Sequence, residues 1–395
     1  MDKVMKVLNP PARIGIIGGG QLGRMLSYEA KRMGYRVIVL DPTPQCPAGQ
    51  VSDGQIIAAF NDCEAIRRLA DCTDVLTYEF EHINADILCE LELEGYHVYP
   101  SGFTLSKIQN KYVQKTILKE AGLPVPEFIK VNTLDQIEET AKLYGFPLVL
   151  KTCIGGYDGK GNYIIRGKDE IHTAYKALGE GIIPLMAEKF VPFIKELSII
   201  VARGGTGQAA FYPVVENIHE QNILRITRAP ANISQEVYTK AKTIANGVLN
   251  ALDDFGVFCI EMFATFEGDI SINEIAPRPH NSGHYTIEAT VTSQYEQLLR
   301  AITGLPLGST RLISPAVMVN ILGNDTVKGS YSLEGYQDIL KEDSVYPHLY
   351  CKAQTNTLKK IGHVTILDES VEHAEFRAKA IMDRLKIVPY KEEHI

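Results

Sequence analysis

The feature that most constrains the fold is a short apolar run that ends in glycines and leads into a helical pattern. Residues 13–18 form the run, apolar residues recur at helical spacing over 22–33, and Gly34 ends that pattern. A second apolar run, 36–41, follows at once, and a third strand and helix unit spans 55–80. Strands and helices at this spacing predict parallel pairing in a doubly wound open α/β sheet.

In the middle of the chain, helices and strands follow one another in a different order. Helical patterns cover 110–121 and 134–144, with prolines between them, and apolar runs at 147–152 and 162–166 flank a glycine-rich loop. Two strands therefore enclose that loop. The other expected elements are a helix at 236–251, a hairpin at 257–275, strands near 316–322 and 363–367, and a helix near 372–385.

At about 150 residues per domain, 395 residues suggest two or three domains. We expect an N-terminal substrate-binding α/β domain at 1–106, a central domain at 107–307 and a small α+β domain at 308–395.

Composition and charge limit the classes of partner that the protein can bind. The formal charge of -8, from 40 basic and 48 acidic residues, provides no basic surface for nucleic acid or an anionic membrane. No apolar run approaches the roughly 20 residues of a membrane span. The seven cysteines contain no C-x-x-C pair, so a zinc ribbon is excluded. We expect a cytoplasmic protein with small-molecule partners.

The first glycine loop leaves its ligand open. Gly18, Gly20 and Gly23 match G-x-G-x-x-G between a strand and a helix, and Asp41 ends the next strand near the offset of a ribose-binding acid. A helix N-terminus binds any phosphate, so a mononucleotide suits the loop as well as a dinucleotide does, and a purely structural turn is the third alternative.

The second glycine loop, GGYDGKGN at 155–162, lies between two strands and carries Lys160. It lacks the P-loop pattern. Backbone N–H groups and a lysine can fold over a triphosphate, and Lys151 on the preceding strand can add a positive charge. The alternative is an ordinary hairpin with solvated lysines.

The hairpin carries two opposed carboxylates. If Glu267-Gly268 is a two-residue turn, Glu261 lies directly opposite Glu274 among apolar residues. Like charges about 5 Å apart are destabilising, and a cation such as Mg²⁺ would relieve the conflict. The alternative is a longer turn that moves the acids to a solvated face.

Beyond the hairpin, a stretch interrupted by proline and glycine carries Arg278, His280, Asn281 and His284. One cation and two neutral donors suit a small oxyanion. Loop histidines are often surface residues, which is the alternative reading.

Several motifs together resemble one family of ATP-grasp ligases. The 5-(carboxyamino)imidazole ribonucleotide synthetases of purine biosynthesis are similar to this chain over nearly its whole length, through the segments IGGGQLGRM, TYEFEH, GGYDGKGN, FYPVVENIH and NEIAPRPHNSGH. The resemblance implies an ATP-grasp architecture and an ATP-dependent carbon–nitrogen ligase. Bicarbonate would carboxylate 5-aminoimidazole ribonucleotide through carboxyphosphate, with Mg²⁺, or Mn²⁺ in its place, as the metal ion.

The resemblance also implies site residues. Glu261 and Glu274 would hold the metal, and Arg278, His280 and Asn281 would be catalytic. The implied ATP contacts are Lys111, Lys151, Gly156, Tyr157, Asp158, Gly159, Lys160, Gly161, Asn162, Glu188, Lys189, Phe190, Val191, Glu196, His219, Asn273 and Glu274. The implied substrate contacts are Gly20, Gln21, Glu81, Tyr157, Lys160, Lys352 and Lys359.

Two positions depart from the family pattern. Lys359 stands where an arginine is expected and offers a point charge without a bidentate fork. Lys111 stands where an arginine is also found and keeps the charge.

The family resemblance suggests a homodimer. Competing functions are another ATP-grasp carboxylase or formate ligase and, from a different class, a nicotinamide-dependent oxidoreductase, which leaves the opposed glutamates unexplained.

Overall fold

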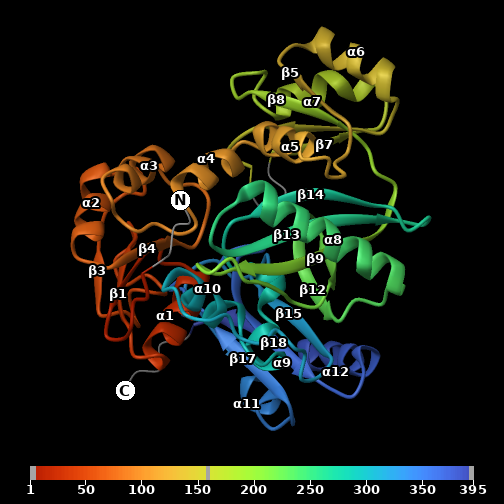
Figure 1. The fold of residues 1–395 in the computed structure, drawn as a ribbon. Helices are drawn as coiled ribbons and strands as arrows, with labels where there is room; N and C mark the ends of the chain where they lie inside the picture. Colours follow the sequence, from red (N-terminus) through yellow and green to blue (C-terminus); the bar gives the residue numbers. More distant parts are fainter. Residues whose placement is uncertain (1–5, 157–160, 391–395) are drawn as a thin grey trace.

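The computed structural model describes residues 6–156 and 161–390 (Figure 1). Its N-terminal part contains a parallel sheet in the order β3-β2-β1-β4, which confirms the predicted doubly wound fold. The strands are β1 (Arg13–Ile17), β2 (Arg36–Leu40), β3 (Gly54–Ile56) and β4 (Val75–Tyr78). Because alternate side chains of a strand point to opposite faces, Ile14 and Ile16 pack against α1 (Gln21–Arg32), whereas Ile17 packs with α2 (Cys63–Asp71) and α3 (Ala85–Leu93).

Two helices lead from this sheet to a second, antiparallel one, in the order β5-β8-β6-β7. The helices are α4 (Gly102–Gln109) and α5 (Lys111–Glu120). The strands are β5 (Phe128–Val131), β6 (Leu148–Thr152), β7 (Asn162–Ile165) and β8 (Leu185–Lys189), with α6 (Leu134–Tyr144) and α7 (Ile171–Ala177) packed on them. Strands β6 and β7 pair directly, so two strands do enclose the glycine loop as predicted.

The largest sheet runs in the order β14-β13-β9-β11-β12-β15-β18-β17, with β10 beside β9. It includes strands from both the central and the C-terminal parts of the chain. Its strands are β9 (Phe193–Arg203), β10 (Ala209–Phe211), β11 (Val215–Glu220), β12 (Ile223–Ala229), β13 (Gly256–Thr265), β14 (Ile270–Ala276), β15 (Ala316–Leu322), β17 (Val345–Leu349) and β18 (Lys360–Leu367).

Helices cover this sheet. Helix α8 (Gln235–Leu252) packs on β9 and β13, and α12 (Val371–Arg384) packs on β15 and β18. Helix α10 (Gln294–Ile302) packs between the sheet and α1. The remaining elements are α9 (Thr286–Ala289), α11 (Tyr336–Ile339), the pair β16 (Tyr331–Glu334) and β19 (Lys386–Pro389), and two short 3-10 turns, η1 (Lys168–Glu170) and η2 (Asn281–Gly283).

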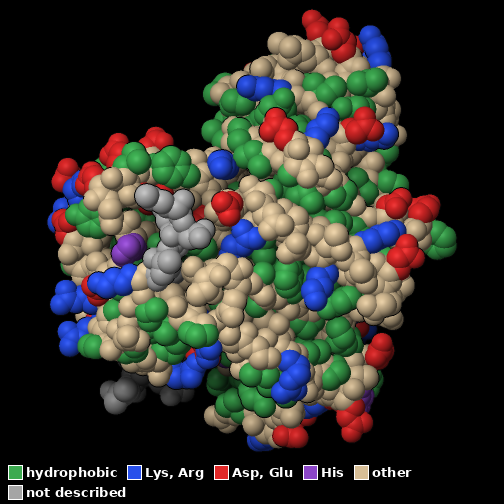
Figure 2. Space-filling view, viewed as in Figure 1, with side chains coloured by type: hydrophobic (Ala, Val, Ile, Leu, Met, Phe, Trp, Pro, Cys, Tyr) green, Lys and Arg blue, Asp and Glu red, His purple; other side chains and the backbone are tan. Residues whose placement is uncertain are grey.

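The N-terminal part and the β5–β8 sheet lie in separate lobes (Figure 1 and Figure 2). In Figure 2 the lobe that carries β5–β8 stands away from the N-terminal lobe, and a notch separates the two. Strands β13 and β14 form part of the molecule's centre next to this notch (Figure 1). Within the described ranges, none of the helices has both the length and the apolar composition that crossing a membrane requires.

Candidate active site

The opposed carboxylates are present, although the turn differs from the prediction. Glu261 pairs with Glu274 across β13 and β14, as predicted. The two-residue turn is wrong: Thr265 donates its N–H to the Asp269 carbonyl at 2.9 Å, so three residues form the turn, with Gly268 at φ +81°. Between the pairs Met262–Ile272 and Glu261–Glu274, a bulge leaves one extra residue, Asn273, in β14. The turn is one residue longer than predicted and the bulge adds one residue to β14, so the two differences cancel and Glu261 still faces Glu274.

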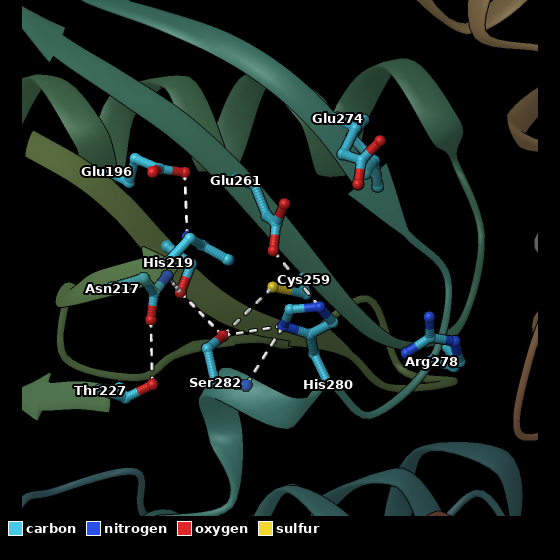
Figure 3. A network of polar contacts seen from close by, with 12 residues as sticks. Glu196, Asn217, His219, Thr227, Cys259, Glu261, Glu274, Arg278, His280 and Ser282 are labelled. Atoms are coloured by element: carbon cyan, nitrogen blue, oxygen red, sulfur yellow. Dashed lines mark hydrogen bonds and ion pairs between the residues drawn. The ribbon is translucent and has the colours of Figure 1, made fainter. Parts of the chain in front are cut away.

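The two glutamates share a face but have different partners (Figure 3). Glu274 accepts a hydrogen bond from the Lys111 ammonium, whose charge lowers the pKa of that carboxyl. Glu261 lies 3.3 Å from Nε2 of His280, and burial, followed by the charge of Glu274, raises the pKa of Glu261. The pair is half-buried and directly opposed, with one lysine already supplying positive charge. Such a donor set fits a hard divalent cation.

A buried ionic cluster supports the lysines. Helix α5 begins at Lys111 because Asn110 caps it, accepting the N–H groups of the next turn. One turn on, Lys115 lies 2.8 Å from Oε1 of Glu188, and Lys151 on β6 lies 2.6 Å from Oε2. Lys151 also donates to Oδ1 of Asn273 at 3.2 Å. Burial lowers the pKa of Lys115 to about 8. Lys115 was not among the predicted residues, although its i,i+4 spacing from Lys111 is visible in the sequence.

Two cavities meet at the hairpin. Cavity A, of about 480 Å³, lies between the N-terminal part and the hairpin, and cavity B, of about 290 Å³, lies between the β5–β8 sheet and the large sheet. Of the residues that the structure describes, five line both: Glu261, Glu274, His280, Asn281 and Lys360. Of the other predicted residues, Gln21, Glu81, Lys111, Gly156 and Arg278 line cavity A, and Lys151, Asn162, Glu188, Lys189, Phe190, Val191, Glu196, His219 and Asn273 line cavity B.

The wall between the cavities offers free polar groups. Both side-chain polar atoms of Asn281 are buried without a hydrogen-bond partner among the described residues. Arg278 is held by Glu81 of the N-terminal part, with 2.8 Å between Nη2 and Oε1. Burial lowers the pKa of His280 well below its usual value, so the ring is neutral. A neutral amide, a neutral imidazole and a guanidinium thus lie beside the carboxylates.

Cavity B is lined by both apolar and charged side chains. Phe190 and Val191 follow β8 directly, and Glu196 lies 3.0 Å from Nδ1 of His219 on the neighbouring strands. Burial tends to lower the pKa of His219, but the adjacent Glu196 outweighs this and raises it. Apolar side chains that suit a flat base and lysines that suit phosphates line the same cavity, a combination that fits a nucleotide.

The first glycine loop already holds an anion from the protein itself. The buried Glu79 carboxylate accepts the N–H of Gly20 at 2.5 Å and that of Gly23 at 2.7 Å, and Asp41 accepts the N–H of Gly19 at 2.8 Å. A β-carbon on Gly20 would lie 2.4 Å from Oε1 of Glu79. The amides that a dinucleotide pyrophosphate would need therefore already have acceptors within the protein. Glu79 was not predicted, because it follows Gly20 by 59 residues.

Some predicted residues lie elsewhere. Tyr157, Asp158, Gly159 and Lys160 fall outside the described residues, and Gly161 precedes β7. Lys360, which had no assigned role, lines both cavities, whereas Lys359 is half-buried beside it and lines neither. Lys352 lies 5.7 Å above the Tyr350 ring, outside the lining of both cavities. Lys360 could have been predicted from the sequence, because it directly follows Lys359, the position where the family pattern has an arginine.

Comparison with known proteins gives three family models along the chain. The ribonucleotide synthetase preATP-grasp domain matches residues 12–109, the ATP-grasp domain 116–295 and the phosphoribosylaminoimidazole carboxylase C-terminal domain 316–377. The N5-carboxyaminoimidazole ribonucleotide synthase of Bacillus subtilis is 42% identical, over 92% of this chain and 93% of its own. The chain belongs to the N5-carboxyaminoimidazole ribonucleotide synthase family.

Solved structures of this family have the same fold. The N5-carboxyaminoimidazole ribonucleotide synthetase from Thermotoga maritima is 47% identical with a TM-score of 0.88, covering 96% of this chain and all of its own. The Aspergillus clavatus enzyme, in complex with ADP and 5-aminoimidazole ribonucleotide, is 35% identical with a TM-score of 0.86, covering 94% and 98%. The expected ATP-grasp architecture, with its N-terminal and C-terminal domains, is confirmed.

Proposed function

We propose that this chain carboxylates 5-aminoimidazole ribonucleotide with bicarbonate and ATP, giving 5-(carboxyamino)imidazole ribonucleotide, ADP and phosphate. The observation that carries the proposal is the meeting of two cavities at one pair of carboxylates, in a chain of this family. A reaction in which a phosphoryl group activates bicarbonate for attack by an amine needs a nucleotide and an acceptor on either side of one centre.

ATP occupies cavity B in this proposal. Phe190 and Val191 contact the adenine, Glu196 binds the ribose, and Lys151 of β6 lies toward the phosphates. Phosphoryl transfer depends on charge neutralisation and positioning more than on acid–base groups, which suits a site built from lysines and backbone amides.

Glu261 and Glu274 would hold Mg²⁺, or Mn²⁺ in its place. When bound, the ion would neutralise charge on the phosphates of the nucleotide. Lys111, which pairs with Glu274 in this structure, would add positive charge beside the same ion. The fit rests on the opposed, half-buried carboxylates described above.

Bicarbonate lies at the shared wall, where Arg278, His280 and Asn281 present one cation and neutral polar groups. The acceptor nucleotide occupies cavity A beside Gln21 and Glu81. Carboxyphosphate is short-lived in water, so enclosure between the two cavities favours attack by the amine over hydrolysis. Lys352, Lys359 and the Gly20 position remain proposed acceptor contacts.

The test is ADP formation by the purified protein with ATP and Mg²⁺. We expect full activity only when both bicarbonate and 5-aminoimidazole ribonucleotide are present. Formate in place of bicarbonate should give no activity, which distinguishes the proposed carboxylation from the reaction of a formate ligase. Fluorescence titration with NADH should show no binding, because Glu79 occupies the loop amides. Tight NADH binding, or activity without the aminoimidazole, would contradict the proposal.

We also propose a homodimer in the cytoplasm and domain limits at 106/107 and 307/308. The dimer follows from the family resemblance alone, and light scattering of the purified chain at micromolar concentration tests it. A monomeric mass would contradict it.

A further inference from the structure

We propose that Ser282, supported by Ser198, is a positioning residue that holds the His280 ring with its hydrogen on Nε2, so that this N–H points at Glu261 and the wall shared by the two cavities. The inference deepens the proposed function and rests on it for the role of His280. The positioning itself is argued from a chain of buried hydrogen bonds.

The chain of contacts runs inward from the large sheet (Figure 3). Thr227 on β12 donates to Oδ1 of Asn217 on β11 at 3.0 Å, and Nδ2 of Asn217 lies 2.9 Å from Oγ of Ser198 on β9. Ser198 donates to Oγ of Ser282 at 2.8 Å, and that hydroxyl lies 2.9 Å from Nδ1 of His280. Five residues from four segments therefore form one continuous series.

The backbone N–H of Ser282 determines which nitrogen of the His280 ring accepts a hydrogen bond. The N–H of Ser282 points at Nδ1 of His280 with a separation of 3.3 Å, capping the η2 turn. An N–H group can only donate, so Nδ1 must be the acceptor. A ring nitrogen that accepts a hydrogen bond carries no hydrogen, and the hydrogen of the ring is therefore on Nε2. Nε2 lies 3.3 Å from Oε1 of Glu261, which can only accept when ionised.

The hydroxyls agree with this direction. Because the Asn217 amide donates to Ser198, the Ser198 hydroxyl is free to donate to Ser282, and the Ser282 hydroxyl is free to donate to Nδ1. Ser198, Ser282 and Thr227 are all 0% exposed, so water does not compete for these bonds. A fully satisfied buried network holds its members in one arrangement.

The opposite tautomer would be unfavourable at both nitrogens. A hydrogen on Nδ1 would face the Ser282 N–H, and the Nε2 lone pair would face the Glu261 carboxylate. With the hydrogen on Nε2, His280 is a hydrogen-bond donor at the shared wall. It therefore steadies a carboxylate or a reacting oxyanion there and does not accept the amine proton.

The first test reads the tautomer directly. The full chain is labelled with ¹⁵N-histidine, and the His280 signal among the ten histidines is assigned by its loss in His280→Gln. Two-bond proton–nitrogen couplings distinguish the tautomers. We expect the Nε2–H pattern at neutral pH, and a shift of the Nδ1 resonance toward its unbonded position in Ser282→Ala. An Nδ1–H pattern in the parent protein would overturn the proposal, whatever the activity of the chain.

The second test separates positioning from stability. Outer partners that orient a functional histidine typically contribute about 10- to 100-fold, so in Ser282→Ala we expect kcat for bicarbonate-dependent ADP formation to fall about tenfold or more. The KM for ATP should change less than about twofold, and Ser282→Thr should restore the rate.

The control is Ser27→Ala, which removes another fully buried serine hydroxyl, one that donates to the Gly23 carbonyl at 2.7 Å. It should leave kcat and the His280 signal unchanged. If Ser282→Ala altered neither the His280 signal nor kcat, the proposal would be wrong. If the parent showed the Nε2–H pattern but no aminoimidazole-dependent activity, the proposed function would fail while the positioning stood.

Discussion

At the scale of single residues, chemically identical groups have different roles because of their neighbours. Glu261 and Glu274 are paired across one hairpin, yet one faces a neutral histidine and the other an ammonium group. Burial raises the pKa of Glu261, whereas Lys111 lowers that of Glu274. Glu274 is thus the more acidic of the two carboxyls, and a divalent ion held between them would favour the ionised form of both.

We expect Glu274→Gln to reduce ATP turnover at least about 100-fold, because a metal ligand contributes several kcal/mol of charge stabilisation. Glu261→Gln should raise the Mg²⁺ concentration needed for half-maximal rate. ADP formation measured over a Mg²⁺ series checks both. Glu267→Gln, at the exposed turn of the same hairpin, is the control and should behave as the parent. If both site variants formed ADP at the parental rate at sub-millimolar Mg²⁺, the assignment of Glu261 and Glu274 as metal ligands would be wrong.

Arg278 gives a second prediction at this scale. Replacing it with alanine should lower bicarbonate-dependent ADP formation by about 10²- to 10³-fold, the cost of one lost preorganised donor. Arg278→Lys should recover part of this rate, since it keeps the charge without the fork. Equilibrium binding of 5-aminoimidazole ribonucleotide is measured in parallel and should change less. Intact ADP formation with lost nucleotide binding would move Arg278 to the acceptor side, beside its partner Glu81.

At the scale of elements, α5 connects the hairpin to the β5–β8 sheet. Its first two turns place Lys111 against β14 and Lys115 against Glu188 on β8, and Lys115 also donates to the Ile272 carbonyl at 3.3 Å. Because Glu188 also binds Lys151 on β6, one carboxylate joins three elements around cavity B. The geometry of the proposed phosphate site thus depends on a helix that contributes a second, fully buried lysine.

Replacing Lys115 tests this connection. We expect Lys115→Met to lower the free energy of unfolding by about 3–5 kcal/mol, because it leaves the buried Glu188 short of a partner. The double variant with Glu188→Gln should lose less than the single one. Urea denaturation measures both, with the exposed Lys142→Met as control. A double variant that is less stable than Lys115→Met would argue against the pairing.

The same cluster predicts a pH dependence. Burial alone would raise the pKa of Glu188, but Lys115 and Lys151 outweigh it and lower the pKa from 4.5 to about 2. A carboxyl with a lowered folded-state pKa stabilises the fold above pH 4.5, and that contribution is lost as the pH falls toward 2. The linked free energy is about 3 kcal/mol. Denaturation at pH 6 and pH 3 should show a smaller loss in Glu188→Gln than in the parent, and equal losses would contradict the assignment.

At the scale of the whole molecule, one apolar core joins segments that sequence patterns assign to different domains. It contains residues of β1, β2 and α1 together with β9, β13 and α10, and Tyr350 from the C-terminal part. Cavity A lies beside this junction, so the relative placement of Glu81 and Arg278 depends on the shared core. Cavity A therefore exists only when the N-terminal and central parts are packed together.

We therefore expect the N-terminal and central parts to unfold together. Calorimetry should show one transition for them, with equal calorimetric and van't Hoff enthalpies. A variant lacking residues 1–106 would expose Tyr295, Leu298 and Leu299 of α10, each 0% exposed in the full chain, and should aggregate. Two separate transitions, or a soluble folded variant, would show that the shared core is dispensable.

The sequence by itself determined the elements and the chemistry they carry. Periodicity placed the helix at 134–144 and the strand at 316–322 with the bounds that the structure has, because both patterns arise within a few residues of one another. The opposed glutamates were also predictable, since pairing in a hairpin is local. Their register survived a wrong turn length only because the bulge at Asn273 compensated for it.

Only the tertiary structure decided which groups complete the site. Glu79 at the α1 N-terminus, Lys115 beside Glu188, and Ser198 beside Ser282 all pair across 59 or more residues of sequence. No periodic pattern links such positions, because the contacts arise from how separate elements pack. The residue types could therefore be read as a ligase site in advance, whereas the buried partners that orient them depend on the folded arrangement of β4, α5, β9 and the η2 turn.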